Sequence, residues 1–269
     1  QQVPPLDINI HMLDWKAMQF RDISLQSRRD KKGMIIDHLE AQGPSISLVG
    51  KGDWLTGWRN PHTTTFDFIL RSSDFGTALK QLEITEGVRN TEGEIVFKWQ
   101  WNAEPHKFSW DLVNGEALIK VEDGSLSDIE PGAGRLLGLL NFETLLSLDF
   151  GSQVSKGFAF DTMNGKFRFN AGNSFTDDFM IKGKVADVSM QGRIGLTNED
   201  YDQVITVIPG VGSTLTVIGA VAGGPVTAAV VHFVQKVFGI NRMAAYKYSV
   251  KGPWSNPEVK LLVKPKDDE

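Results

Sequence analysis

Cysteine is absent from the 269-residue sequence, and other common features of enzyme active sites are absent with it. Without cysteine the chain has no thiol nucleophile, no disulfide bond and no thiolate metal ligand. The five histidines never occur at the i,i+4 or HExxH spacing that places two ligands on one helix face. The nucleophile motif GxSxG is missing as well. These absences argue against an enzyme and against a sequence-local metal site.

The sequence has no complete dinucleotide-binding motif, and one segment resembles such a motif only in part. The segment GAGRLLG at residues 132–138 falls one residue short of GxGxxG, and it follows Glu130-Pro131 instead of a buried parallel strand. We interpret it as a tight turn whose glycines lead into a helix. The sequence therefore predicts no cofactor.

An excess of positive charge is also lacking. The chain has 28 basic and 33 acidic residues, a net charge of −5 and a pI near 5.6. Proteins that bind nucleic acid usually carry a strongly basic surface. Nucleic acid is therefore not predicted as a partner.

Charge disappears altogether from one stretch, residues 203–235, where 33 consecutive residues carry no charged side chain. A membrane-spanning helix needs about 20 apolar residues in a row. Proline and glycine interrupt this stretch, and its two helix-compatible pieces, Ser213–Ala222 and Pro225–Phe238, reach only about 15–21 Å each. We therefore expect an apolar helical hairpin over residues 203–239 that covers a surface, and not a membrane span.

Alternation of apolar and polar residues is what the sequence has in abundance. Such alternation is typical of half-buried antiparallel strands, and it recurs along most of the chain, including Ile95–Trp101 and Phe108–Leu112. Ser73–Leu82 instead has helical spacing, with Ser73 or Asp74 as the expected N-cap. The pattern predicts a mainly β protein in which residues 1–269 form one elongated unit with a few inserted helices.

Several of the expected strands carry aromatic residues on one face, for example Phe97, Trp99 and Trp101. Such a face suits the core of a sandwich or barrel. It suits equally a sheet that curls around an apolar ligand such as an acyl chain. Alternation does not separate these alternatives, because a core and a lipid groove select the same residue types.

Four successive segments resemble a known family. They are EPGAGRLLGLLNFETL, KGFAFDTMNGKFRFNAGNSFTDDFMIKG, DYDQVITVIPGVGSTLTVIGAVAGGPVTAAVVHFVQKVFG and YKYSVKGPW. Their order and length are similar to the C-terminal region of the YhdP-like branch of AsmA-like proteins, most closely over Asn114–Leu262. The resemblance implies a curved antiparallel sheet, a groove or taco-like half-barrel with an apolar lining. It also implies a periplasmic part of a longer Gram-negative envelope protein, whose inner-membrane anchor lies outside this chain.

The resemblance further implies movement of phospholipid between the inner and outer membranes, without catalytic residues. We therefore expect acyl chains to be held in the groove while head groups stay in water. The expected lipid-binding residues are Ile95, Phe97, Trp99, Phe158, Phe160, Phe167, Phe169, Val188, Met190 and Ile194.

The apolar hairpin is expected to pack over the end of this groove. Leaving its eight large side chains in water would cost on the order of 12–24 kcal/mol, so they must contact the sheet, a membrane or a partner. In the alternative hypothesis the chain is a structural end-piece, and the hairpin docks it to the outer membrane or to an envelope protein. The expected contact residues are Leu215, Val217, Ile218, Val230, Val231, Phe233, Val234 and Val237.

Overall fold

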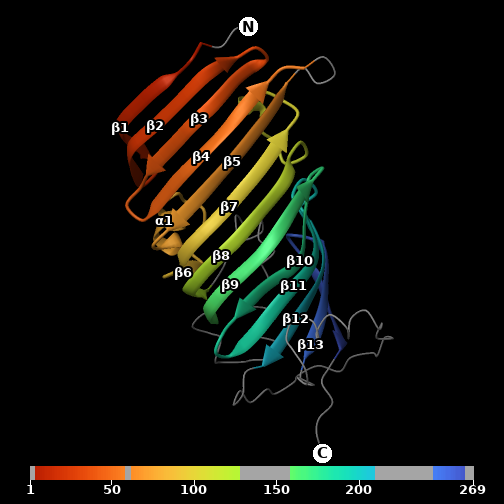
Figure 1. The fold of residues 1–269 in the computed structure, drawn as a ribbon. Coiled ribbons are helices and arrows are strands. Elements are labelled where there is room, and N and C mark those ends of the chain that lie inside the picture. Colours follow the sequence, from red (N-terminus) through yellow and green to blue (C-terminus); the bar gives the residue numbers. More distant parts are fainter. Residues whose placement is uncertain (1–3, 58–61, 128–157, 210–244, 264–269) are drawn as a thin grey trace, which may run out of the picture.

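The computed structural model describes residues 4–57, 62–127, 158–209 and 245–263, and strands dominate these parts (Figure 1). The two short helices are α1 (Phe75–Gln81) and the 3-10 turn η1 (Pro105–Lys107). The strands are β1 (Asp7–Trp15), β2 (Met18–Asp30), β3 (Gly33–Gln42), β4 (Ile46–Leu55), β5 (Thr63–Ser72), β6 (Val88–Arg89), β7 (Glu92–Trp101), β8 (Asn114–Leu126), β9 (Phe158–Asn170), β10 (Asn173–Lys182), β11 (Ala186–Gly195), β12 (Asp200–Pro209), β13 (Tyr246–Pro253) and β14 (Glu258–Val263).

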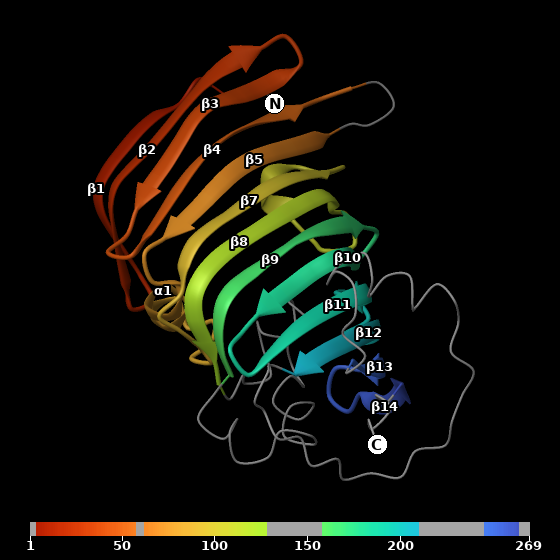
Figure 2. The same cartoon turned by 60° about the horizontal axis from the view of Figure 1, so that its bottom comes forward.

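All fourteen strands in the described residues belong to one antiparallel sheet. Each strand pairs with its neighbours in sequence, except that β5 pairs directly with β7 and the two-residue β6 pairs with β8. The sheet starts at β1, ends at β14, and is not closed into a barrel. Its longer strands arc around one face, most visibly β8 and β9 (Figure 2). The expected mainly β, curved antiparallel fold is confirmed, whereas the organisation of residues 1–269 as one unit stays a prediction.

The curvature has local causes in bulges and glycines. Register shifts interrupt the β2–β3, β3–β4 and β9–β10 ladders, and bulges of this kind bend and twist strands. Gly165 on β9 allows a close contact: a Cβ at this position would lie 2.6 Å from the Cα of Phe179 on β10. Glycine is therefore required where the ring of Phe179 packs against the neighbouring backbone.

The helix predicted over Ser73–Leu82 is confirmed as α1. Asp74 is the N-cap, and its Oδ1 accepts a hydrogen bond of 3.0 Å from the backbone N–H of Thr77. Phe75 and Ala78 are buried against the sheet. The helix lies where β5 ends and β7 begins, and the Phe75 N–H donates to the carbonyl of Thr91 just before β7.

The strand predicted over Phe108–Leu112 is wrong. The segment between η1 and β8 is a loop that ends in a turn, where the Leu112 N–H donates to the Ser109 carbonyl at 3.1 Å. The alternation arises because Phe108 and Trp110 pack on the aromatic side chains of β7, and not because the backbone pairs with another strand. Tertiary packing of the rings explains the pattern.

The predicted hairpin over residues 203–239 is wrong for its first seven residues. Residues 203–209 are the larger part of β12, which pairs with β11 and β13. Its remaining residues, 210–239, include all eight expected contact residues and lie outside the described residues. Within the described parts of the chain, no helix is long and apolar enough to cross a membrane.

Candidate functional site

One face of the sheet carries apolar side chains in rows that run from strand to strand. Residues paired across neighbouring strands share a face, so the register defines these rows directly. We call this surface the inner face. One row consists of Leu48, Leu70, Ile95 and Ile119, and the next of Phe68, Phe97, Ala117 and Phe167. Farther along the sheet a row continues through Phe179, Met190, Ile205 and Tyr248.

The ten expected groove residues come together on this inner face. Nine belong to, or pack against, one hydrophobic cluster, and the tenth, Trp99, contacts the rings of Phe97 and Phe169 at 4.7 and 5.4 Å. Their exposure differs along the sheet. The side chains on β7 and Phe169 are half-buried. The other six, Phe158, Phe160, Phe167, Val188, Met190 and Ile194, are at most 3% exposed.

The accessible part of the inner face lies toward β1. There an apolar cavity of about 370 Å³ opens between β1, β4 and the end of α1, and Leu13 and Trp15 on its wall are 40% and 58% exposed. This volume falls in the range of about 300–1,000 Å³ that is typical of ligand pockets. The lining contains no polar side chain; it consists of Leu13, Trp15, Phe20, Ile23, Ala41, Ile46, Leu48, Leu70 and Leu82.

Sequence reasoning missed this cavity because a bulge changes the phase of alternation in β2. Asp22 and Ile23 together lie opposite Ala41, between the pairs Arg21–Gln42 and Ser24–Glu40, and Asp22 has a φ of 49°. As a result Phe20 and Ile23, three residues apart, line the same cavity. Strict alternation would have placed them on opposite faces.

An aromatic cluster borders the inner face at the end of β7. Trp99 is at its centre, and the loop after η1 adds Phe108 and Trp110, whose rings lie 6.0 and 5.6 Å from that of Trp99. The Trp101 indole N–H fixes the start of this loop by donating to the Glu104 carbonyl at 3.1 Å. Since α1 lies at the opposite end of β7, the inner face is bordered by α1 on one side and by this loop on the other.

The opposite face is polar and ion-paired where the inner face is apolar. On β7, Glu94 and Lys98 alternate with the inner-face residues, and Glu94 pairs with Arg71 of β5 at 3.2 Å. On β8, Glu116 pairs with Lys166 of β9, and the hydrogen bond from Lys166 lowers the pKa of Glu116. By contrast, the inner-face rows of β7–β14 contain no charged side chain among the residues that the structure describes.

A few buried polar atoms interrupt the apolar inner face. Gln203 is 1% exposed, and neither its Oε1 nor its Nε2 has a hydrogen-bond partner. The Ser174 hydroxyl, the Tyr248 hydroxyl and the Trp99 indole N–H are also buried without a partner. A buried polar group without a partner costs about 1–3 kcal/mol. These unpaired groups therefore reduce the stability of the folded sheet.

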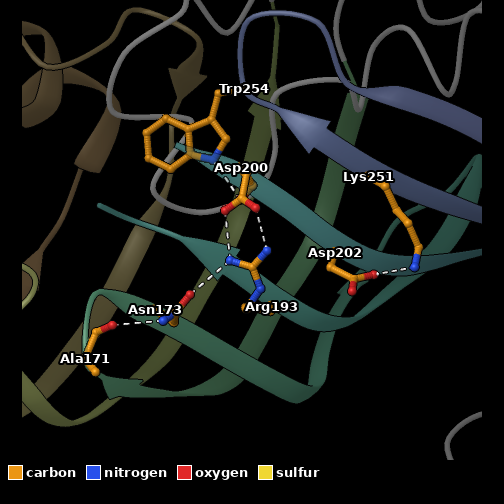
Figure 3. Close-up of polar contacts among 7 residues, drawn as sticks. All are labelled: Ala171, Asn173, Arg193, Asp200, Asp202, Lys251 and Trp254. Carbon is orange, nitrogen blue, oxygen red and sulfur yellow. Dashed lines mark hydrogen bonds and ion pairs between the residues drawn. The ribbon is translucent and has the colours of Figure 1, made fainter. Parts of the chain in front are cut away.

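A polar cluster at the β11–β12 turn has a structural role (Figure 3). The Arg193 guanidinium donates to both oxygens of Asp200 at 2.8 and 2.6 Å, and to Asn173 Oδ1 at 2.9 Å. The Trp254 indole donates to the backbone carbonyl of Asp200 at 3.1 Å. The hydrogen bonds from Arg193 lower the pKa of Asp200. Nearby, Lys251 pairs with Asp202 at 2.9 Å, so polar contacts hold β10 to β13 in register.

No group of three or more potential metal ligands occurs in the parts of the chain that the structure describes. The geometry of the site is that of a surface for binding, on which an apolar ligand can displace water.

The comparisons with known proteins agree with this geometry. The pattern of the family described as YhdP protein matches residues 1–259. This chain belongs to that family. It is also 24% identical over 278 aligned positions to the intermembrane phospholipid transporter YhdP of Escherichia coli strain K12. That alignment covers 97% of the chain but 22% of the relative, so the chain spans about a fifth of the relative's length. No solved structure matches the chain.

Proposed function

We propose that this member of the YhdP family is a lipid-binding section of an intermembrane phospholipid transporter. Phospholipid acyl chains lie against the inner face, head groups stay in water, and no covalent bond is made or broken. The expected residues Ile95, Phe97, Trp99 and Phe169 contact these chains. The buried residues of β9 and β11 form the hydrophobic support beneath and beyond them.

The observation that carries the proposal is an apolar inner face that is accessible to solvent near β1. Four large apolar side chains of β1 that face this side are 37–58% exposed: Ile8, Ile10, Leu13 and Trp15. Contiguous exposed apolar surface of this kind marks a binding site in a folded protein. Each methylene of an acyl chain that leaves water contributes about 0.8 kcal/mol, so burial of an acyl chain in the apolar cavity of about 370 Å³ is favourable.

The proposed location is the periplasm, where the section belongs to a longer protein with an inner-membrane anchor. The E. coli relative is named an intermembrane phospholipid transporter, which supports a place in the envelope. That relative is also about five times as long as the aligned region, which supports a longer protein. Docking of the 210–239 segment to the outer membrane or to an envelope protein stays a prediction, because that segment lies outside the described residues.

Site-specific photo-crosslinking tests the proposed function with a matched pair of neighbouring residues. Leu48 and Val49 are adjacent on β4 and both half-buried, but Leu48 is on the inner face and Val49 on the opposite face. A photoreactive amino acid at position 48 should capture phospholipid in cells, and one at position 49 should not. Equal capture at both positions, or none at position 48, would contradict the proposal.

A further inference from the structure

A second cavity lies at the other end of the N-terminal strands, between the β2–β3 turn and η1. Its volume is about 440 Å³, and most of its lining is polar, unlike that of the apolar cavity. The lining residues are Arg29, Asp30, Lys31, Lys32, Gly33, Trp54, Thr56, His62, Glu104 and His106. Neither the sequence motifs nor the comparisons assign a role to this group.

The turn side of the cavity has three cations, Arg29, Lys31 and Lys32, without carboxylate partners among the described residues. Their neighbour Arg28 differs, since it points to the opposite face and pairs with Asp37 at 3.0 Å. The one acidic residue of the turn, Asp30, accepts a hydrogen bond of 2.9 Å from the backbone N–H of Lys32 and thereby fixes the turn. Three cations against the one carboxylate of Asp30 leave this wall with a net charge of +2.

The opposite wall is a fixed hydrogen-bonded network. The Trp54 indole N–H donates to His62 Nδ1 at 3.2 Å, and His62 Nε2 lies 3.4 Å from Glu104 Oε1. Glu104 also accepts from Lys107 at 3.1 Å. Hydrogen bonds from its own backbone N–H and from Lys107 lower the pKa of Glu104. The Glu104 charge is thus already paired and does not neutralise the cations across the cavity.

Gly33 allows the β2–β3 turn and β4 to lie close to each other. A Cβ at this position would lie 2.0 Å from the Trp54 carbonyl oxygen, so any other residue would displace the basic turn from β4. The turn is also held by Thr56, whose backbone N–H and hydroxyl both donate to the Lys32 carbonyl, at 2.6 and 2.8 Å. The cations are therefore carried on a fixed turn.

The register connects this cavity to the inner face. Arg29 is the first member of a row that continues through Met34, Trp54, Thr64 and Trp101. Along β4, Trp54 is six residues from Leu48 in the apolar cavity, a distance of about 20 Å in an extended strand. Two layers of acyl chains span roughly 30 Å of a bilayer, so one phospholipid has the length to approach both cavities.

We propose that the cavity between the β2–β3 turn and η1 is a phosphate-binding site. Lys31, Lys32 and Arg29 bind the phosphate, and Trp54 lies at the boundary between polar and apolar surface. In the complete form of the proposal the phosphate belongs to a phospholipid whose acyl chain runs along β4 toward Leu48. That lipid form rests on the proposed function, whereas binding of phosphate itself does not.

Two variants with the same change in net charge test the site. K31Q/K32Q removes both turn lysines, and K182Q/K184Q removes two lysines beside another hairpin turn, between β10 and β11. Binding of inorganic phosphate is measured by calorimetry at low salt. Lipid loading is measured by native mass spectrometry after incubation with vesicles that contain phosphatidylglycerol and diacylglycerol, which has no phosphate.

For K31Q/K32Q we expect weaker phosphate binding and a fall of about fivefold in the ratio of loaded phosphatidylglycerol to diacylglycerol, with diacylglycerol loading unchanged. K182Q/K184Q should match the wild type in both. Because the charges are exposed, the preference should also weaken as salt rises. Wild-type phosphate binding by K31Q/K32Q would overturn the proposal. Lost phosphate binding with an unchanged lipid ratio would restrict the site to free phosphate. Failure of the wild type to load either lipid would refute the proposed function alone.

Discussion

Replacing Gln203 by leucine should stabilise the ligand-free protein. Gln203 is 1% exposed on the inner face of β12, and both polar atoms of its amide lack a partner. Folding therefore removes the amide from water without a compensating hydrogen bond, which costs about 1–3 kcal/mol. Leucine has a similar volume and no polar atom. We expect the Gln203→Leu free energy of unfolding to exceed that of the wild type by roughly this amount.

The measurement is urea denaturation followed by tryptophan fluorescence, on protein from which lipid has been extracted. The matched control is Gln191→Leu on β11, because the Gln191 amide donates to the Asp177 carbonyl at 3.0 Å on the opposite face. Loss of that bond should lower stability by about 1 kcal/mol or less. We therefore expect Gln203→Leu to raise the free energy of unfolding and Gln191→Leu to lower it.

A Gln203→Leu protein that is less stable than the wild type by more than about 1 kcal/mol would refute this reasoning. It would mean that the amide has a partner in solution, such as an ordered water molecule, and that the inner face at β12 is hydrated. The same variant then serves in the lipid-loading assay. Because Gln203 is 1% exposed and has no surface for a ligand, Gln203→Leu should load as much lipid as the wild type.

Three further substitutions test the supports of the sheet. Arg193 lowers the pKa of Asp200 below its usual value of 3.8, so this pair stabilises the fold above that pH, and the contribution disappears as pH falls through the lowered pKa. Asp200→Asn should therefore cost about 1 kcal/mol at pH 7 and little in strong acid, measured by urea denaturation at both pH values. Gly165→Val should destabilise by about 1–3 kcal/mol despite the strand propensity of valine, because its Cβ would overlap Phe179; a thermal melt at or above that of the wild type would contradict this. Asp74→Ala should cost about 1 kcal/mol through loss of the α1 N-cap, with Asp74→Asn close to the wild type in the same melts.

The sequence predicted those features of the fold that depend on local chemistry. Alternation identified β7 through Ile95, Phe97 and Trp99, and the N-cap chemistry of Asp74 identified α1. Prediction failed where side chains are positioned by distant parts of the chain. Phe108 and Trp110 alternate with polar residues because their rings contact Trp99, and not because their backbone pairs with another strand. No signal within the segment itself distinguishes these two origins.

The sequence indicated the apolar residues of β9 and β11, but it did not indicate the two cavities among the N-terminal strands. These cavities also depend on contacts that are not local in the sequence. Alternating apolar residues indicated β9, through its phenylalanines, and β11, through Val188, Met190 and Ile194; six of these side chains are at most 3% exposed. The accessible cavity near β1 depends on the bulge at Asp22, which brings Phe20 and Ile23 to one surface. The basic cavity depends on a long-range approach, that of Gly33 to Trp54. Neither feature has a fixed spacing in the sequence.

The inner face is buried to different extents along the sheet, so it resembles a packed core near β11 and an accessible groove near β1. Apolar rows cover the inner face on β4–β9 and again on β10–β14, so its chemistry is nearly constant, but its exposure is not. A residue such as Val188 at 2% exposure stabilises the sheet and has no surface left for a ligand. Leu13 at 40% exposure gains from covering by an acyl chain. Lipid should therefore enter from the β1 side, and substitutions there should reduce lipid loading while leaving stability largely intact, whereas substitutions on β11 should do the reverse.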